Sequence, residues 1–533
     1  MIVYLILFTF FLAFGGIAEK YELYVKFLET KDVNLGKELV RKYPNAPFRD
    51  ELLYKLILIL DKKERKEIPY FLKLLNPENI HGEKRIKFLR KLYEKYKINP
   101  KKLIISYPHL FIRELKMYKF TDKEKEEIAK KLFRKRLYKK VIKLSRDCTL
   151  KGRALYRLKR INEAINTLKK CKDKKSKEIL LYILLKQESY KEIKKLVKDY
   201  PFLSFIAGKE LLERGKVSEA IGFLSQSNEE EAKFYLGLAH YLLGKYKYAE
   251  KYFLKYSPKK DIDRAKGLFW LFKTYVELEN TDKAYIYLGK TAEYNNFYGA
   301  AAKKMLGKNV YKDIILTDIS EPNLYYELRK IYDLGFLNYM RYEALRNIEK
   351  ISKGDILLLQ SLDPYISIRL AVNKYGTDSD IYRYVSHPTP YRELVKEASQ
   401  RFGVSEVLIY AIMRQESLFD PFAESYAGAK GLMQLMDYTA RWKAEQLGIK
   451  VRNIFEPKVN VMLGTAYLAY LIRLFNGDLV RVIAAYNAGH NAVRKWKRYG
   501  DDFLFIELIP YDQTRKYTKK VLYNYYIYSE KLK

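Results

Sequence analysis

The sequence predicts an all-α protein in two parts, a superhelix of short paired helices followed by a compact helical domain. Three observations lead to this prediction. Residues 19–380 show helical periodicity with almost no alternation of polar and apolar residues. A short motif ending in alanine recurs within this region. Two prolines, Pro388 and Pro390, then interrupt the helical pattern, and longer apolar-periodic segments follow them.

The chain begins with an uncharged apolar run over residues 1–18, which ends in the small residues Gly16 and Ala18 before the first charge at Glu19. This pattern predicts a secretory signal peptide. Because the run lacks a preceding lysine or arginine, an uncleaved N-terminal membrane anchor is the alternative. No later run approaches the roughly 20 apolar residues that a spanning helix needs. We therefore expect an exported chain, which makes nucleic acid a poor candidate partner.

The recurring motif predicts tetratricopeptide-like helix–turn–helix repeats. Its alanines Ala220, Ala249 and Ala284 are 29 and 35 residues apart. A spacing near 34 is typical of these repeats, in which a small residue lets paired helices approach closely. Residues 19–140 have the same composition without a clear repeat, and we extend the superhelical region over residues 19–385. The motif occupies residues 160–165, 215–221, 244–249 and 280–285.

The second part, residues 388–533, has the size of one ordinary domain. Its apolar periodicity predicts a bundle of helices joined by short loops. Helices are expected at about 391–402, 405–417, 437–447, 458–475, 478–488 and 513–531.

The positive charge lies mainly outside this second part. The whole chain carries a net charge of +38, and residues 388–533 hold 22 Lys and Arg against 15 Asp and Glu, which leaves +31 for residues 1–387. A basic surface attracts polyanions such as an anionic membrane face or an acidic cell-wall polymer. A solvated lysine-rich surface is the alternative. The two cysteines, Cys148 and Cys171, either form one disulfide or remain buried thiols.

Glu416 ends the helix expected at 405–417. It follows Ile412 by four residues, so it lies at the edge of the apolar face and near the C-terminal end of the helix. Burial and the helix dipole both raise the pKa of a carboxyl group in that position. A carboxylic acid that donates a proton near neutral pH needs such a raised pKa. A solvated glutamate at a helix end is the alternative.

Two further blocks contain glycine next to polar side chains. Residues 431–436 read Gly-Leu-Met-Gln-Leu-Met, where the glycine allows a ligand to approach the backbone and Gln434 offers a donor and an acceptor. Residues 483–489 form a helix end that stops on its glycine, with Tyr486 and Asn487 in the last turn.

Glu416-Ser417 and these two blocks, in this order and spacing, resemble the soluble lytic murein transglycosylases, whose catalytic domain is related to goose-type lysozyme. The resemblance in motifs covers residues 388 to about 520. Members of this family join an exported, periplasmic helical superhelix, often closed into a ring, to a lysozyme-like domain. The resemblance implies the same all-α architecture, a tetratricopeptide-like superhelix followed by a lysozyme-like domain, and leaves ring closure open.

The resemblance also implies a role for each matched residue. Glu416 would be the sole catalytic acid and base, and Ser425 would help orient the substrate's N-acetyl group. Gln434 and Met436 would line saccharide subsites, and Tyr486 would place its hydroxyl near the Glu416 carboxyl group. No metal or other cofactor is implied. The other matched substrate-binding positions are Asn487 and Gln513.

The chain departs from the family pattern at two positions. Asp437 stands where the family usually has proline, and we expect it to cap the next helix. Gln513 stands where the family commonly has a glutamate that contacts sugar. The second departure puts subsite affinity or specificity in doubt and leaves the catalyst in place.

The function implied is cleavage of the β-1,4 bond between N-acetylmuramic acid and N-acetylglucosamine, with formation of 1,6-anhydromuramic acid ends. The expected partners are peptidoglycan strands, with peripheral contact to a membrane or to other cell-wall enzymes also open. Hydrolysis by the same glutamate, as in a lysozyme-type muramidase, is the closest alternative. A non-catalytic peptidoglycan-binding scaffold is another, and a basic adaptor for proteins or nucleic acid would require a chain that is not exported.

Overall fold

The computed structural model describes residues 16–63 and 66–533, and these residues form helices joined by loops, with isolated β-bridges and no strands. The predicted all-α class is confirmed. The signal-peptide prediction falls mainly on residues 1–15, outside the described residues. None of the described helices is both long enough and apolar enough to cross a lipid bilayer.

The chain divides into two compact units. The first comprises the described residues up to Ile183 together with Glu321–Asp355, and the second comprises Leu184–Ser320 together with Ile356–Lys533. The domain boundary predicted at residues 386–391 lies inside the second unit and stays a prediction.

The helices of the first unit are short, and local capping bonds fix where several of them begin. The Asp32 side chain accepts from the backbone of Asn34, and Thr121 and Glu124 form a reciprocal capping box. The helices are α2 (Glu19–Thr30), α3 (Val33–Lys42), α4 (Arg49–Asp61), α5 (Ile68–Leu74), α6 (Glu83–Lys95), α7 (Lys101–Ser106), α8 (Asp122–Arg134), α9 (Tyr138–Leu144), α10 (Cys148–Arg157), α11 (Ile161–Lys170), α21 (Tyr325–Asp333) and α22 (Leu337–Arg346). Two more, α12 (Lys174–Lys186) and α23 (Lys353–Leu362), cross from one unit into the other.

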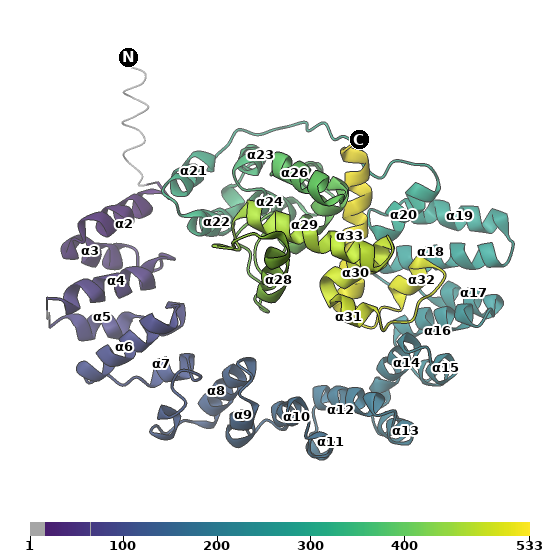
Figure 1. The fold of residues 1–533 in the computed structure, drawn as a ribbon, viewed down its shortest axis with the longest axis horizontal. Helices are drawn as coiled ribbons and strands as arrows, with labels where there is room; N and C mark the ends of the chain where they lie inside the picture. Colours follow the sequence, from purple (N-terminus) through teal and green to yellow (C-terminus); the bar gives the residue numbers. More distant parts are fainter. Residues whose placement is uncertain (1–15, 64–65) are drawn as a thin grey trace. The chain divides into compact units, whose positions relative to one another are not determined.

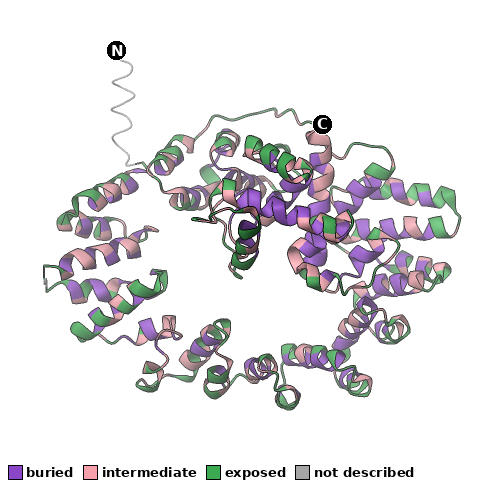
Figure 2. Ribbon diagram, in the orientation of Figure 1, coloured by how far each residue is buried: buried purple, intermediate pink, exposed green. Residues whose placement is uncertain are grey.

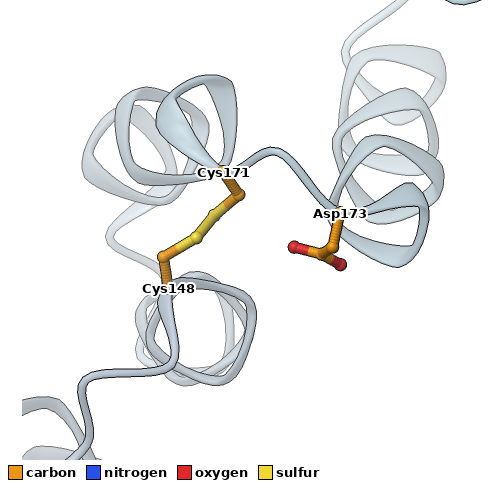
Figure 3. A group of neighbouring side chains, drawn as sticks. All are labelled: Cys148, Cys171 and Asp173. Atoms are coloured by element: carbon orange, nitrogen blue, oxygen red, sulfur yellow. A yellow bond between two sulfur atoms is a disulfide. The ribbon is translucent and has the colours of Figure 1, made fainter.

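The two cysteines are bonded to each other in the first unit. Cys148 begins α10 and Cys171 directly follows α11, so the disulfide ties the start of one helix to the end of its partner (Figure 3). Asp173 lies beside the disulfide, where its carboxylate accepts a 2.7 Å hydrogen bond from the Thr149 hydroxyl. Of the two alternatives that the sequence allowed, a disulfide or two buried thiols, the structure has the disulfide.

Paired helices form the first part of the second unit. Consecutive helices lie side by side in the pairs α14–α15, α16–α17 and α18–α19 (Figure 1). The repeat alanines Ala220, Ala249 and Ala284 are buried in the second helix of each pair, which agrees with the predicted repeats. The helices here are α13 (Tyr190–Asp199), α14 (Ser204–Glu213), α15 (Val217–Leu224), α16 (Glu230–Leu242), α17 (Tyr246–Lys255), α18 (Asp261–Glu277), α19 (Thr281–Ala292) and α20 (Phe297–Met305).

A glycine in the first helix of a pair permits this close approach. A β-carbon built on Gly208 would lie 2.6 Å from Leu224, and one on Gly237 would lie 2.6 Å from Phe253. In both pairs the glycine and its partner are sixteen residues apart. Gly152 and Leu168 in α10 and α11 repeat the spacing in the first unit. The close packing of each pair therefore depends on glycine, which has no side chain, at this position.

The second part of this unit contains the six helices expected from apolar periodicity, each within two residues of its predicted bounds. Sequence reasoning missed two short helices, α31 (His490–Val493) and α32 (Asp502–Glu507). Most of α29 is buried (Figure 2), and α33 packs against both α27 and α30. The helices are α24 (Pro364–Tyr375), α25 (Asp380–Val385), α26 (Arg392–Phe402), α27 (Glu406–Glu416), α28 (Asp437–Leu447), α29 (Pro457–Leu474), α30 (Leu479–Ala488), α31 (His490–Val493), α32 (Asp502–Glu507) and α33 (Asp512–Lys531).

Candidate active site

Glu416 is the last residue of α27, and its half-buried side chain lies next to α33. Ser417 fixes the chain directly after it. The Ser417 hydroxyl lies within hydrogen-bond distance of the Met413 carbonyl, at 3.2 Å, and of the Leu432 carbonyl, at 2.8 Å, and it accepts from the Phe419 amide. This serine therefore joins the end of the helix to the 431–436 block, and its bonds are local.

Tyr517 on α33 donates a hydrogen bond of 2.7 Å to Oε1 of Glu416. Burial raises the pKa of Glu416 to about 7, and the hydrogen bond from Tyr517 lowers it by less. No other acidic or basic group in the described part of the chain contributes to this shift. A carboxyl group with this pKa can donate a proton near neutrality and accept one back.

The 431–436 block is held by one buried asparagine. Asn460, on α29, accepts from the Met433 amide at 2.8 Å and donates to the Lys430 carbonyl at 2.9 Å. Gly431 has a φ of +77°, and a β-carbon there would lie 2.3 Å from the Asn460 amide nitrogen. Glycine is required at this position for both reasons.

Gln434 and Ser425 brace the same loop. The Gln434 amide nitrogen donates to the Ala423 and Gly431 carbonyls at 2.9 and 3.0 Å, which leaves its side-chain oxygen for a ligand. The Ser425 hydroxyl accepts from the Ala429 amide at 2.9 Å, across the tight turn at residues 425–429. Met436 is half-buried directly before α28.

Tyr486 and Asn487 lie in the last turn of α30 as expected. The charge of Glu416 helps to raise the pKa of Tyr486, after the larger effect of burial, so the two side chains lie near each other. The Tyr486 hydroxyl donates to the Met433 carbonyl at 2.9 Å, while Tyr517 is the tyrosine bonded to Glu416. Asn487 accepts from the Thr514 hydroxyl and so joins α30 to α33.

The two departures from the family pattern have different outcomes. Gln513 is exposed in the first turn of α33, four residues before Tyr517. The expectation that Asp437 caps the next helix is wrong. Met436 occupies the cap position of α28, and the Asp437 carboxylate instead accepts from Lys430 at 2.9 Å. An aspartate in the first helical turn still favours the helix through its dipole.

A buried ion pair and a hydrogen bond join α33 to helices of the repeat region. Arg515 donates to Glu213 of α14 at 2.6 Å and to the Glu507 carbonyl at 2.8 Å. Lys519 donates to the Tyr298 hydroxyl at 2.6 Å and to the Glu507 carboxylate at 2.9 Å. These contacts flank Tyr517 on both sides along α33.

Sequence reasoning missed Tyr517 and this network. Tyr517 is one of 50 tyrosines in the chain. One signal in the sequence could have pointed to Tyr517. It follows Gln513, a predicted substrate-binding residue, by four positions, and residues four apart lie on the same face of a helix.

Comparison with known proteins places this site in a family. Residues 393–509 match the model of the transglycosylase SLT domain. An uncharacterized protein of Aquifex aeolicus is 44% identical over 139 residues, which are 26% of this chain and 77% of that protein. A putative soluble lytic murein transglycosylase of Haemophilus influenzae is 37% identical over 147 residues. The soluble lytic murein transglycosylase of Salmonella typhimurium is 26% identical over 284 residues, half of this chain. The matched segments span 25% and 44% of the latter two proteins.

Two solved structures share the fold over almost the whole chain. One is an inactive glutamate-to-glutamine mutant of the lytic transglycosylase Slt from Pseudomonas aeruginosa, with a TM-score of 0.62 and 20% identity, covering 99% of this chain and 94% of that one. The other is the 70 kDa soluble lytic transglycosylase of Escherichia coli, with a TM-score of 0.61 and 17% identity, covering 96% and 92%.

Proposed function

The chain belongs to the soluble lytic murein transglycosylase family, and from this we infer that it cleaves the glycan strands of peptidoglycan. The bond cleaved is the β-1,4 link from N-acetylmuramic acid to N-acetylglucosamine, and the product carries a 1,6-anhydromuramic acid end. The observation that carries this proposal is a single carboxyl group, Glu416, whose pKa lies near 7 and whose hydrogen-bond partner is a neutral tyrosine.

A one-carboxylate site favours a substrate-assisted reaction. Glycosidases that use two carboxylates hold them about 5 Å apart when retaining and about 6.5–9.5 Å apart when inverting. In the described residues no second carboxylate acts on the pKa of Glu416, which supports a nucleophile supplied by the substrate.

The reaction then has two steps. Protonated Glu416 donates its proton to the glycosidic oxygen, while the N-acetyl carbonyl oxygen attacks the anomeric carbon and the leaving sugar departs. The Glu416 carboxylate next takes the proton of the 6-hydroxyl group, whose oxygen displaces the N-acetyl oxygen and closes the 1,6-anhydro ring. Tyr517 is a positioning residue, since its hydrogen bond stabilises the carboxylate that exists between the two steps.

The other matched residues bind substrate in this proposal. Ser425 orients the N-acetyl group, and Gln434 uses the amide oxygen that its loop contacts leave available. Met436 and Asn487 line saccharide subsites beside it. Gln513 contacts sugar from the exposed first turn of α33. Tyr486 supports the loop through Met433 and shares the surroundings of Glu416.

We also propose that the chain acts outside the cytoplasm, in the periplasm, after export directed by residues 1–18. Residues 388–533 form the catalytic domain, and the matched segment 393–509 lies within it. The basic residues 19–385 form the superhelical region and draw the anionic strand toward the catalyst. Binding of the Glu416→Gln chain to peptidoglycan should then weaken as salt rises, and salt-independent binding contradicts this role.

Product mass tests the proposed reaction. Purified peptidoglycan is digested with the full chain and with Glu416→Gln, which keeps the side-chain shape but cannot donate the proton. We expect soluble muropeptides lighter by one water than the hydrolysed form, and none from the variant. Reducing-end products would indicate a muramidase instead. Binding without products from either protein would indicate a scaffold.

A further inference from the structure

We propose that the catalytic domain carries a second binding site, which takes the terminal carboxylate of a short peptide, in a pocket formed by α26, α28 and α29. The pocket has a volume of about 170 Å³, and three cationic side chains, Arg401, Lys443 and Arg473, line it together with apolar residues such as Leu447 and Ala466. None of the lining residues belongs to the candidate catalytic or saccharide-binding set.

Lys443 is the buried cation of this pocket. Its side chain is 4% exposed, and its ammonium group lies 4.0 Å from the centroid of the Trp442 ring and 4.5 Å from that of Tyr470. The ammonium donates to the Gln446 side-chain oxygen at 3.0 Å. It has three donors, and within residues 16–63 and 66–533 it has no carboxylate partner.

A buried ammonium without a counter-charge is unfavourable. Burial lowers the pKa of Lys443, and the positive charge of Arg473 lowers it further. Burying a cation in the absence of an anion costs free energy that an ion pair largely recovers. The pocket therefore gains stability when an anion enters it.

Arg401 and Arg473 are exposed beside this buried ammonium, and neither forms an ion pair with the described residues. A guanidinium group presents paired donors in a plane that matches a carboxylate. Among the described residues, the pocket is lined by two guanidinium groups and one ammonium group and by no acidic side chain, so it carries a net positive charge. These are the features of an anion site.

The size and walls of the pocket select among anions. Its volume lies below the roughly 300–1,000 Å³ of pockets that hold drug-sized ligands, so it admits a small group rather than a chain of sugars. The apolar wall formed by Phe402, Leu447 and Ala466 suits a short aliphatic group beside the charge. A C-terminal alanine has both the carboxylate for the cationic side chains and a methyl group for the apolar wall.

This assignment rests on the proposed function, because peptidoglycan carries stem peptides with free carboxylates. The pocket would hold such a peptide while Glu416 acts on the glycan, since the loop of residues 431–436 continues directly into α28 and is held by Asn460 of α29. Two of the three helices that form the pocket therefore also support the catalytic loop.

Binding of a small peptide acid tests the site. N-acetyl-D-alanyl-D-alanine is titrated into the full Glu416→Gln chain while tryptophan fluorescence is recorded, because Trp442 lies under the Lys443 ammonium. We expect saturable binding that weakens about tenfold or more for the C-terminal amide of the same dipeptide and for Arg473→Gln, which each lose a charge-assisted hydrogen bond. Lys443→Met, which keeps the length of the side chain, should weaken it similarly.

Arg498→Gln is the matched control, since Arg498 is exposed and lies outside the pocket lining, and it should bind the acid as the parent chain does. Equal binding of acid and amide, unchanged binding in Arg473→Gln and Lys443→Met, or tighter binding of inorganic phosphate than of the dipeptide would overturn the proposal. Loss of dipeptide binding with anhydro products intact would overturn the pocket alone. Saturable binding by a chain that releases no products would support the pocket and count against the proposed reaction.

Discussion

Two glutamates of the second unit, Glu416 and Glu213, differ in their partners although desolvation raises the pKa of each to about 7. Glu213 is 6% exposed and pairs with Arg515, whose charge opposes the shift. Glu416 is half-buried, and its hydrogen-bond partner among the described residues is the neutral Tyr517. A raised pKa alone therefore does not distinguish Glu416, the proposed catalytic acid, from Glu213. Glu416 is accessible and has no counter-charge in the part of the chain that the structure describes, so it can exchange protons with a substrate. The buried ion pair between Glu213 and Arg515 instead joins two helices.

The largest expected effect separates the two glutamates by activity. Glu416→Gln should lower the rate of product release by about 10²–10⁴-fold, the usual contribution of general acid–base catalysis. Glu213→Gln should leave the rate per folded molecule within a few-fold of the parent chain. Muropeptide release from purified peptidoglycan measures both. Equal losses of product release in the two folded variants would contradict the proposal that Glu416 alone of these two glutamates acts in catalysis.

The next effect separates them by stability. Glu213→Ala removes the buried carboxylate partner of Arg515 and leaves it the exposed Asp512 as its carboxylate partner, which should lower the free energy of unfolding by about 1–3 kcal/mol. Replacing both partners, as in Glu213→Ala with Arg515→Met, should recover part of that loss because the buried guanidinium donor that faced Glu213 is also gone. Urea unfolding of the single and double variants measures this. A double variant no more stable than the single one would argue against an ion-pair role.

Tyr517→Phe tests the neutral partner. The hydrogen bond from Tyr517 lowers the pKa of Glu416, so its loss should raise that pKa. Because the first step needs protonated Glu416, activity should fall as pH rises through about 7 in the parent chain and at a higher pH in the variant. The maximal rate should drop about 10- to 150-fold, since a hydrogen bond to a charged group contributes about 1.5–3 kcal/mol. A pH–rate profile measures both changes, and an unshifted alkaline limb would contradict the positioning role.

The smallest effect is on stability as a function of pH. Folding raises the pKa of Glu416 from 4.5 to about 7, so the folded chain binds more protons between these values and this contribution to stability is lost as pH rises through them. Glu416→Gln should therefore be about equal in stability to the parent chain near pH 4 and more stable near pH 8. We expect about 1–2 kcal/mol near pH 8, less than the roughly 3 kcal/mol of the full pKa shift, because water screens a half-buried group. Thermal unfolding at both pH values checks this, with the reverse order at the higher pH as the contrary result.

Three of the helices near the site could be predicted because each ends at a strong local signal. Gly403, Gly448 and Gly489 close α26, α28 and α30, and all three have positive φ values. Glu416 could be proposed as the catalytic acid because its position in the helix and two glycine-containing blocks agreed. Local sequence carries this information.

Contacts between distant segments could not be predicted in the same way. Tyr517 reaches Glu416, and Arg515 reaches Glu213, only through the packing of α33 against α27 and α14. Periodicity places α33 as a helix but does not give its neighbours. The cap expected at Asp437 failed for a related reason, because Lys430 across the loop attracts that carboxylate.

The bond between Tyr517 and Glu416 spans 101 residues of chain. A ribosome therefore makes Glu416 well before Tyr517, and the buried contacts of Arg515 and Lys519 join α33 to helices made earlier still. A growing chain holds Glu416 without Tyr517 until α33 has been added. The order of synthesis thus delays assembly of the candidate active site until α33 has been made.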